Sequence, residues 1–233
     1  MLDRYYKKYA LAYVLGNLKR RNLLNLLPTT LVNKNLIDYN SEEMQAVFDV
    51  AKNNEVKLYH FKKTDSLLPR VQKVIGFLKG VYFENLLDVG SGRGVFLLPF
   101  LENFSYANVI SVELLDKRVN MLEDIKNGGI DNLTVINSDF CNLQLDKKSV
   151  DVVTMLEVLE HIENVEKAVE KAVEIAKKYI VITVPSKPDD NPEHIHLLTK
   201  NDLTAIFNRL GINKLTFDGV NGHLFMVAKL END

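Results

Sequence analysis

Residues 86–96 carry the side chains and spacing with the clearest chemical potential in this sequence. The run reads L-L-D-V-G-S-G-R-G-V-F, so Asp88 closes a short apolar stretch and a glycine-rich loop follows. Glycine has no Cβ, so such a loop can take positive φ and bring its backbone against a ligand. We expect the main chain here to hold a nucleoside-like cofactor, at Gly90, Ser91, Gly92 and Gly94.

Two features of this run disfavour a dinucleotide. The dinucleotide fingerprint G-x-G-x-x-G, counted from Gly90, requires a third glycine where Val95 stands. The Asp88 carboxylate would also oppose a bound phosphate, whereas it favours a cation such as the ammonium of an amino-acid moiety. This charge fits S-adenosylmethionine.

Glu113 follows the next apolar run, 25 positions after Asp88. An α/β nucleotide site places a carboxylate for the ribose hydroxyls at about this distance in the chain. Adjacent parallel strands bring their carboxyl ends within about 5 Å of each other, so a ligand on the glycine loop meets the end of the next strand. Glu113 is therefore the expected ribose ligand.

A second group of ligating side chains follows the expected fourth strand. Glu157, Glu160 and His161 stand at i, i+3 and i+4 and would share one face of a helical turn. Two carboxylates and an imidazole can converge on one divalent cation, either Mg²⁺ or Zn²⁺. The alternative is that Glu160 and His161 only cap the turn and orient their neighbours, without a metal.

The elements that must position these residues follow from periodicity. From residue 85 onward, short β-branched runs alternate with amphipathic segments, which is typical of an α/β fold with a parallel sheet covered on both faces. The expected strands are 85–89, 108–112, 133–137, 150–155, 179–184, 214–218 and 224–228. The expected helices are 93–103, 116–127, 165–177 and 200–210, and Pro99 should kink or shorten the first of them.

Residues 1–80 form a helical N-terminal extension with a different charge from the body, residues 81–233. The extension carries 14 Lys and Arg against 7 Asp and Glu, whereas the body carries 15 against 24. Such a split could steer an anionic substrate, or the two parts could simply attract one another. Tyr5, Tyr9 and Tyr13 recur at helical spacing and form either a stacking platform for bases or an aromatic face packed on the body.

Composition excludes several classes of protein. A single cysteine, Cys141, leaves no internal disulfide framework and no C-x-x-C metal site, and it agrees with a reducing compartment. No apolar run approaches the roughly 18–20 residues that cross a bilayer, and the N-terminus lacks a signal-peptide pattern. We expect a cytoplasmic protein without a membrane span, whose oligomeric state the sequence leaves open.

The segment D-V-G-S-G-R-G resembles motif I of class I S-adenosylmethionine-dependent methyltransferases. The resemblance covers about 150 residues and implies a Rossmann-like seven-stranded sheet with an antiparallel last strand. It also implies that Asp139 accepts from the adenine amino group while Phe140 packs on the ring. Leu114 and Leu156 complete the cofactor-binding residues that it implies.

The run E-x-x-E-H is similar to the segment that ubiquinone-biosynthesis O-methyltransferases and small-RNA 3′-end 2′-O-methyltransferases use for a divalent metal. The RNA enzymes have a further histidine after the fifth strand, and His194 occupies that place here. It is a candidate fourth ligand, or the base that takes a proton from an acceptor hydroxyl. His223 has no supporting cluster.

These observations predict methyl transfer from S-adenosylmethionine to a hydroxyl, or less readily an amine, of a small-molecule acceptor. His161 and His194 are the expected catalytic residues, and the N-terminal helices would cover the acceptor as a lid. One alternative is an RNA-modifying ribose 2′-O-methyltransferase, which the basic extension favours. A second alternative is a non-catalytic protein that only binds S-adenosylmethionine.

Overall fold

Seven strands of the part of the chain described here form one sheet, in the order β3-β2-β1-β4-β5-β7-β6. The computed structural model describes residues 4–58, 61, 68–188 and 190–230, with the side chains of 4–6 left aside. Only β7 runs against its neighbours in this sheet. The strands are β1 (Asn85–Val89), β2 (Asn108–Glu113), β3 (Leu133–Asn137), β4 (Val150–Leu156), β5 (Ala176–Pro185), β6 (Leu215–Val220) and β7 (His223–Lys229).

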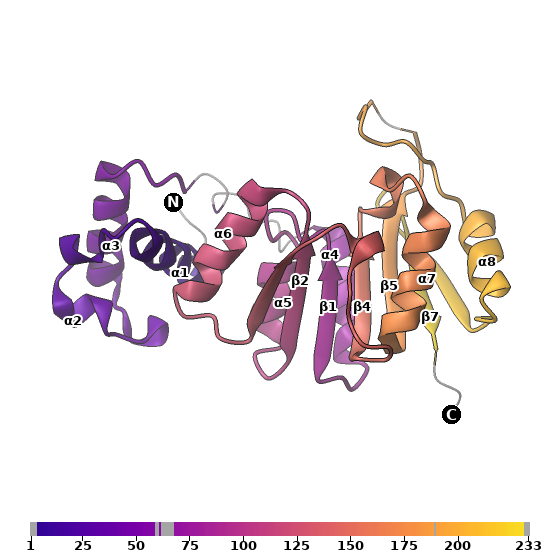
Figure 1. Ribbon diagram of the computed structural model, residues 1–233, viewed down its shortest axis with the longest axis horizontal. Coiled ribbons are helices and arrows are strands. Elements are labelled where there is room, and N and C mark those ends of the chain that lie inside the picture. Colours follow the sequence, from indigo (N-terminus) through magenta and orange to yellow (C-terminus); the bar gives the residue numbers. More distant parts are fainter. Residues whose placement is uncertain (1–3, 59–60, 62–67, 189, 231–233) are drawn as a thin grey trace.

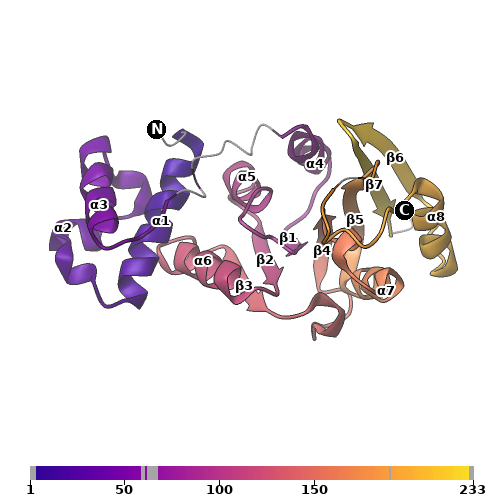
Figure 2. The same ribbon diagram turned by 90° about the horizontal axis from the view of Figure 1, so that it is seen from above.

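Helices cover both faces of the sheet, as predicted, and Figures 1 and 2 show α4 and α5 on one side with α7 on the other. Alternate strand residues point to opposite faces, so Leu86 joins the apolar cluster under α4, α5 and α6 while Leu87 joins the cluster under α7 and α8. The helices are α4 (Pro69–Lys79), α5 (Leu97–Asn103), α6 (Asp116–Asn127), α7 (Val165–Ile175) and α8 (Lys200–Arg209).

Short 3-10 turns and the first three helices complete the described chain. The turns are η1 (Leu24–Leu26), η2 (Leu36–Asp38), η5 (Phe140–Asn142) and η6 (Leu159–His161). The N-terminal helices are α1 (Arg4–Arg20), α2 (Thr29–Val32) and α3 (Ser41–Asn53). None of the described helices combines the length and the apolar character needed to span a bilayer.

Helix α5 departs most from its predicted bounds. It begins at Leu97 and not at residue 93, because the loop backbone stays in turns up to Phe96. Pro99 consequently lies in the first turn, where its missing N–H costs no helical hydrogen bond. Helix α8 begins at a reciprocal capping box formed by Thr199 and Asp202.

Helix α1 lies between two apolar clusters at one end of the molecule (Figure 1). One side of α1 contacts the cluster under α4 and α5, and the other side packs on α2 and α3. Its backbone touches that of α6, because a Cβ on Gly16 would meet the Asp124 carbonyl oxygen at 1.8 Å. The N-terminal helices therefore lie against the outer side of α6, at the flank of the sheet.

The tyrosines of the predicted N-terminal stripe lie in different environments. Tyr9 is buried, and its hydroxyl donates to Glu102 Oε2 at 3.1 Å. This position agrees with the interpretation that the tyrosines pack on the body. Tyr13 is half-buried and its ring lies 5.5 Å from that of Phe61. The side chain of Tyr5 lies outside the described residues.

Candidate active site

A cavity of about 390 Å³ opens at the carboxyl ends of β1, β2 and β4. Open parallel sheets bind ligands at this edge, where the strand order reverses. Several residues singled out from the sequence come together in its wall, although they lie up to 71 positions apart in the chain: Gly90, Glu113, Leu114, Asp139, Phe140 and His161.

The glycine loop owes its path to positive φ at three positions. Gly90, Gly92 and Gly94 have φ of 66°, 60° and 79°, which L side chains rarely adopt. Their amides are bonded within the protein: Gly90 N–H to the Val112 carbonyl, Gly92 N–H to Glu113 Oε2 and Gly94 N–H to the Ser91 carbonyl. The glycines thus supply the loop's conformation, whereas the expectation was that these amides face a ligand.

Asp88 lies beneath the loop in a buried network of hydroxyl groups. Its carboxylate accepts from Ser91 Oγ at 2.6 Å and from Thr154 Oγ1 at 2.7 Å. Ser111 Oγ in turn donates to Ser91 Oγ at 2.7 Å. Burial raises the pKa of Asp88 to about 6, with a further contribution from Glu113, against the opposing effect of the two hydrogen bonds.

Glu113 ties the end of β2 to the glycine loop. One carboxylate oxygen accepts from the amides of Leu114 and Leu115 at 3.0 Å, and the other accepts from Gly92 N–H at 2.8 Å. Arg118 Nη1 lies 3.9 Å from that second oxygen. The buried carboxylate is held in one orientation by three amides and retains accepting capacity on Oε2.

Asp139 and Phe140 lie at the end of β3, as their predicted roles require. Asp139 Oδ1 accepts from the Cys141 amide, so the aspartate also caps η5, which is the alternative role of a residue at this place. Phe140 is buried, and it also lines the cavity. Leu156 packs on an apolar cluster, and Val158 rather than Leu156 lines the cavity.

Glu160, His161 and His194 form a cluster at one end of the site. Their ligating atoms all lie within 4.8 Å of one another, and the two imidazole rings lie 4.7 Å apart at 70°. Glu160 is fully buried. His161 Nδ1 lies 2.9 Å from the Glu193 carbonyl oxygen and must donate to it, which leaves the lone pair on Nε2 in the neutral ring.

Glu157 is not part of this cluster, contrary to the expectation of one shared helical face. The residue has φ of 57°, so the chain turns sharply before the short turn η6. Its carboxylate accepts from Thr183 Oγ1 at 2.8 Å and lies 3.0 Å from His223 Nε2. His223, expected to stand alone, therefore has a carboxylate partner on the β5–β7 side of the site.

The segment around His194 is held by a side chain whose role the sequence did not indicate. His196 does not belong to the cluster, and its Nε2 lies 3.1 Å from the Ile162 carbonyl and 3.3 Å from that of Glu163. The Ile195 amide also donates to the Glu160 carbonyl at 2.9 Å. These bonds place His194 beside His161 across a gap of more than 30 residues in the chain.

Sequence reasoning missed the hydroxyl residues that position the two acids. Thr154, Thr183 and Ser111 lie in β4, β5 and β2 and are fully buried, and the two threonines hold Asp88 and Glu157 respectively. A lone Ser or Thr in a buried strand needs a hydrogen-bond partner. A Ser or Thr within a buried strand could therefore have identified these three residues from the sequence.

Comparison with known proteins agrees with this geometry. Residues 87–181 match the family described as "Methyltransferase domain". No curated protein matches the sequence. The match begins within β1 and ends within β5, so it covers the glycine loop, Glu113 and the cluster residues Glu160 and His161.

Solved structures show the same fold at low sequence identity. A SAM-dependent methyltransferase from Aquifex aeolicus is 22% identical, with a TM-score of 0.56 over 72% of this chain and 94% of that one. The N-terminal domain of EvdMO1, solved with SAH bound, is 14% identical, with a TM-score of 0.61 over 82% of this chain and 97% of that one.

The sheet order, the reversed strand β7 and the loop at the end of β1 define a Rossmann-like methyltransferase fold. The match of residues 87–181 to the methyltransferase-domain family, together with this fold, supports the class I S-adenosylmethionine-dependent methyltransferases as the class of protein that this chain resembles.

Proposed function

We propose that this methyltransferase transfers its methyl group to a hydroxyl oxygen of a small-molecule acceptor. The observation that carries the proposal is the position of His161, which lines the cofactor cavity and also belongs to the cluster with Glu160 and His194. A hydroxyl must lose its proton as the oxygen bonds to carbon, so a base at this position serves O-methylation directly.

In the proposed reaction the acceptor oxygen attacks the methyl carbon of S-adenosylmethionine. The carbon–sulfur bond breaks, its electron pair stays on sulfur, and S-adenosylhomocysteine leaves. The hydroxyl proton passes to an imidazole nitrogen. His161 suits this role because its Nδ1 is held by the Glu193 carbonyl and its Nε2 carries the lone pair, while the adjacent His194 is the other candidate.

The remaining cavity residues take the cofactor in this proposal. Glu113 would accept from the ribose hydroxyls through Oε2, and Asp88, once ionised, would attract the ammonium group of the methionine moiety. Asp139 and Phe140 would contact the adenine, and Leu114, which is largely exposed at the cavity edge, would cover its other face.

A divalent metal fits the donor set of the cluster. One carboxylate and two imidazoles suit Zn²⁺ or a similar transition ion better than Mg²⁺, which prefers oxygen ligands alone. Glu160, His161 and His194 would hold it, and His161 Nε2, as a ligand, would then not be the group that takes the hydroxyl proton. When bound, such an ion lowers the pKa of a coordinated hydroxyl group.

Radiolabelled methyl donor, incubated with the protein and a fractionated cell extract, tests the acceptor class. We expect label in the small-molecule fraction, and we expect His161→Ala and His194→Ala to lose transfer while their affinity for S-adenosylhomocysteine stays within about twofold. Label in RNA would instead favour ribose methylation. Cofactor binding with no labelled product in any fraction would favour a non-catalytic protein.

Elemental analysis of purified protein tests the metal separately. We expect about one equivalent of metal in the wild type and its loss in Glu160→Gln. Glu157→Gln is the matched control, because this carboxylate is turned onto Thr183 and His223. Equal metal content in all three proteins would exclude the cluster as the binding site.

A further inference from the structure

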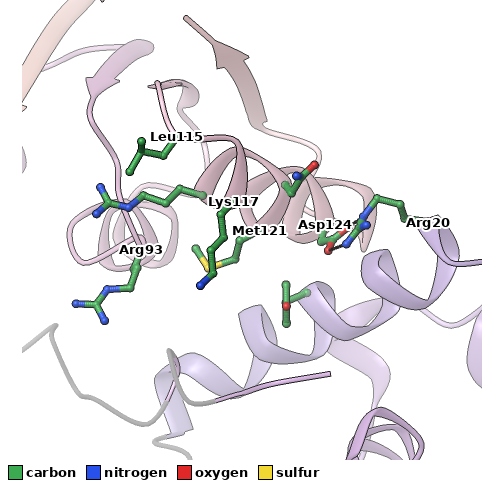
Figure 3. A pocket seen from close by; sticks show the side chains of 9 residues that line it. Arg20, Arg93, Leu115, Lys117, Met121 and Asp124 are labelled. Carbon is green, nitrogen blue, oxygen red and sulfur yellow. Dashed lines mark hydrogen bonds and ion pairs between the residues drawn. The ribbon is translucent and has the colours of Figure 1, made fainter. Parts of the chain in front are cut away.

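A second cavity, of about 700 Å³, lies between α1 and α6 beside the glycine loop. Figure 3 shows Arg93 and Lys117 extending into it from the loop and from the first turn of α6, with Met121 in its wall. It is larger than the cofactor cavity, and nothing in the methyl-transfer chemistry uses it.

The charges in this wall do not cancel. Four cationic side chains, Arg20, Arg93, Lys117 and Arg118, face a single carboxylate, Asp124. Arg20 is turned onto that buried carboxylate at the far end of the cavity, with both contacts at 2.8 Å (Figure 3).

Arg93 and Lys117 form no hydrogen bond or ion pair with any other residue in the described ranges, and Arg118 lies at 3.9 Å from Glu113. Arg93 and Lys117 thus remain available to an anion, and Arg118, which pairs with Glu113, lines the same wall. Guanidinium groups match the oxygens of phosphate especially well, because their planar N–H donors can bond two oxygens at once.

The apolar part of the wall indicates that the ligand is larger than an inorganic ion. Tyr13, Met121 and Leu115 line the cavity next to the cationic groups. Leu115 and Arg118 also line the cofactor cavity, so the two cavities share a wall. A ligand here would lie beside the bound cofactor without occupying its place.

We propose that this second cavity binds the phosphate of a phosphorylated organic ligand, through Arg93, Lys117 and Arg118. The apolar residues would contact the body of the same ligand. The phosphate can belong to a small phosphorylated molecule or to the backbone of RNA, since both present the same group. The proposal does not depend on the identity of the methyl acceptor or on methyl transfer itself.

Calorimetry on the full chain saturated with S-adenosylhomocysteine tests the proposal, because the cofactor cavity is then filled. The probes are inorganic pyrophosphate and, in a second arm, a 5′-phosphorylated single-stranded RNA of ten nucleotides. The variants are Arg93→Gln and Lys117→Gln, singly and together. Lys52→Gln on α3 is the matched control, since it removes one exposed positive charge outside the cavity.

We expect pyrophosphate to bind the wild type, each single variant to weaken binding about tenfold and the double variant about a hundredfold. The control should bind like the wild type. RNA binding that greatly exceeds pyrophosphate binding and is weakened by the same variants would also support the site and would assign its phosphate to nucleic acid, with a steep salt dependence.

Three results would overturn the proposal. The first is the absence of binding by both probes. The second is wild-type affinity in the double variant, or equal weakening in Lys52→Gln. The third is binding that disappears when S-adenosylhomocysteine is present, since pyrophosphate would then have been in the cofactor cavity.

Discussion

The two halves of the candidate active site are built by different means. The glycine-loop half, formed by Asp88, residues 90–94 and Glu113, is held by hydrogen bonds among β1, β2, β4 and the loops that follow the first two. The histidine half, formed by Glu160, His161 and His194, depends on one segment docking onto another, at Glu160, Ile162 and Glu163.

This difference in construction predicts that substitutions in the two halves will have different effects. Strand ends in one sheet are placed by the sheet's own register, so the cofactor half is fixed before any ligand arrives. The docked segment of the histidine half is held by hydrogen bonds between two loops and not by the register of a sheet. We therefore expect substitutions in the first half to change cofactor affinity and substitutions in the second to change turnover.

The largest effect is expected from Gly90→Ala. The new Cβ would lie 2.7 Å from Val158 Cγ2 at a residue with φ of 66°, so the loop or Val158 must move. We expect S-adenosylhomocysteine affinity to fall at least about a hundredfold and stability to fall by about 1–3 kcal/mol. Calorimetry and thermal unfolding measure the two losses.

Gly219→Ala is the control for this substitution, because a Cβ there meets nothing within 4 Å and the backbone needs no positive φ. It should match the wild type in affinity and stability. Affinity of Gly90→Ala within a factor of two of the wild type would show that the first half is not rigid.

The second largest effect is expected from His196→Ala. Loss of its bonds to the Ile162 and Glu163 carbonyls frees the segment that carries His194. We expect turnover to fall about 10- to 100-fold through misplacement of His194, with cofactor affinity within about twofold of the wild type. Steady-state kinetics and calorimetry on the same protein separate the two quantities. A parallel loss of both would contradict the division of the site.

A smaller, pH-dependent effect is expected at Asp88. Its pKa of about 6 means that the carboxyl is mostly protonated at pH 5 and mostly ionised at pH 7. The ionised form attracts the ammonium of the cofactor, so affinity should rise as pH rises through 6, by about tenfold between pH 5 and pH 7. Calorimetry with S-adenosylhomocysteine at several pH values measures it.

Asp88→Asn provides the comparison for this profile, because it keeps the size of the side chain and removes its titration. We expect weaker binding whose remaining pH dependence is flat across this interval. A profile identical to the wild type would assign the titration to a group other than Asp88.

The smallest effect is expected from Glu157→Gln. The Glu157–His223 pair is about one-fifth exposed on each side, and such pairs contribute less than about 1 kcal/mol. We expect turnover within about threefold of the wild type, measured beside Glu160→Gln, which should be far less active. An equal loss of turnover in both variants would indicate that Glu157 acts together with Glu160, His161 and His194.

The local pattern of apolar and polar residues predicted most of the strands and helices. The seven-stranded sheet and the reversed β7 agree with what the motif implied, and seven of the singled-out residues line one cavity, Glu157 among them. The start of α5 was misplaced, because positive φ at Gly94 keeps the chain in turns and a sequence window does not display backbone angles. The hydroxyl partners of the two acids were also missed, because a pairing across strands joins residues about 20 to 70 positions apart.

By itself, the sequence determined that a carboxylate, a glycine loop and a second acid would stand at neighbouring strand ends, because parallel strands bring their carboxyl ends to one edge. Only the tertiary structure decided which ligating groups meet. The turn at Glu157 separates it from Glu160, and His196 brings His194 to them, because contacts between distant segments depend on backbone direction and docking rather than on spacing along the chain. The cavity between α1 and α6 likewise depends on how these two helices, which lie in contact at Gly16, are placed against each other.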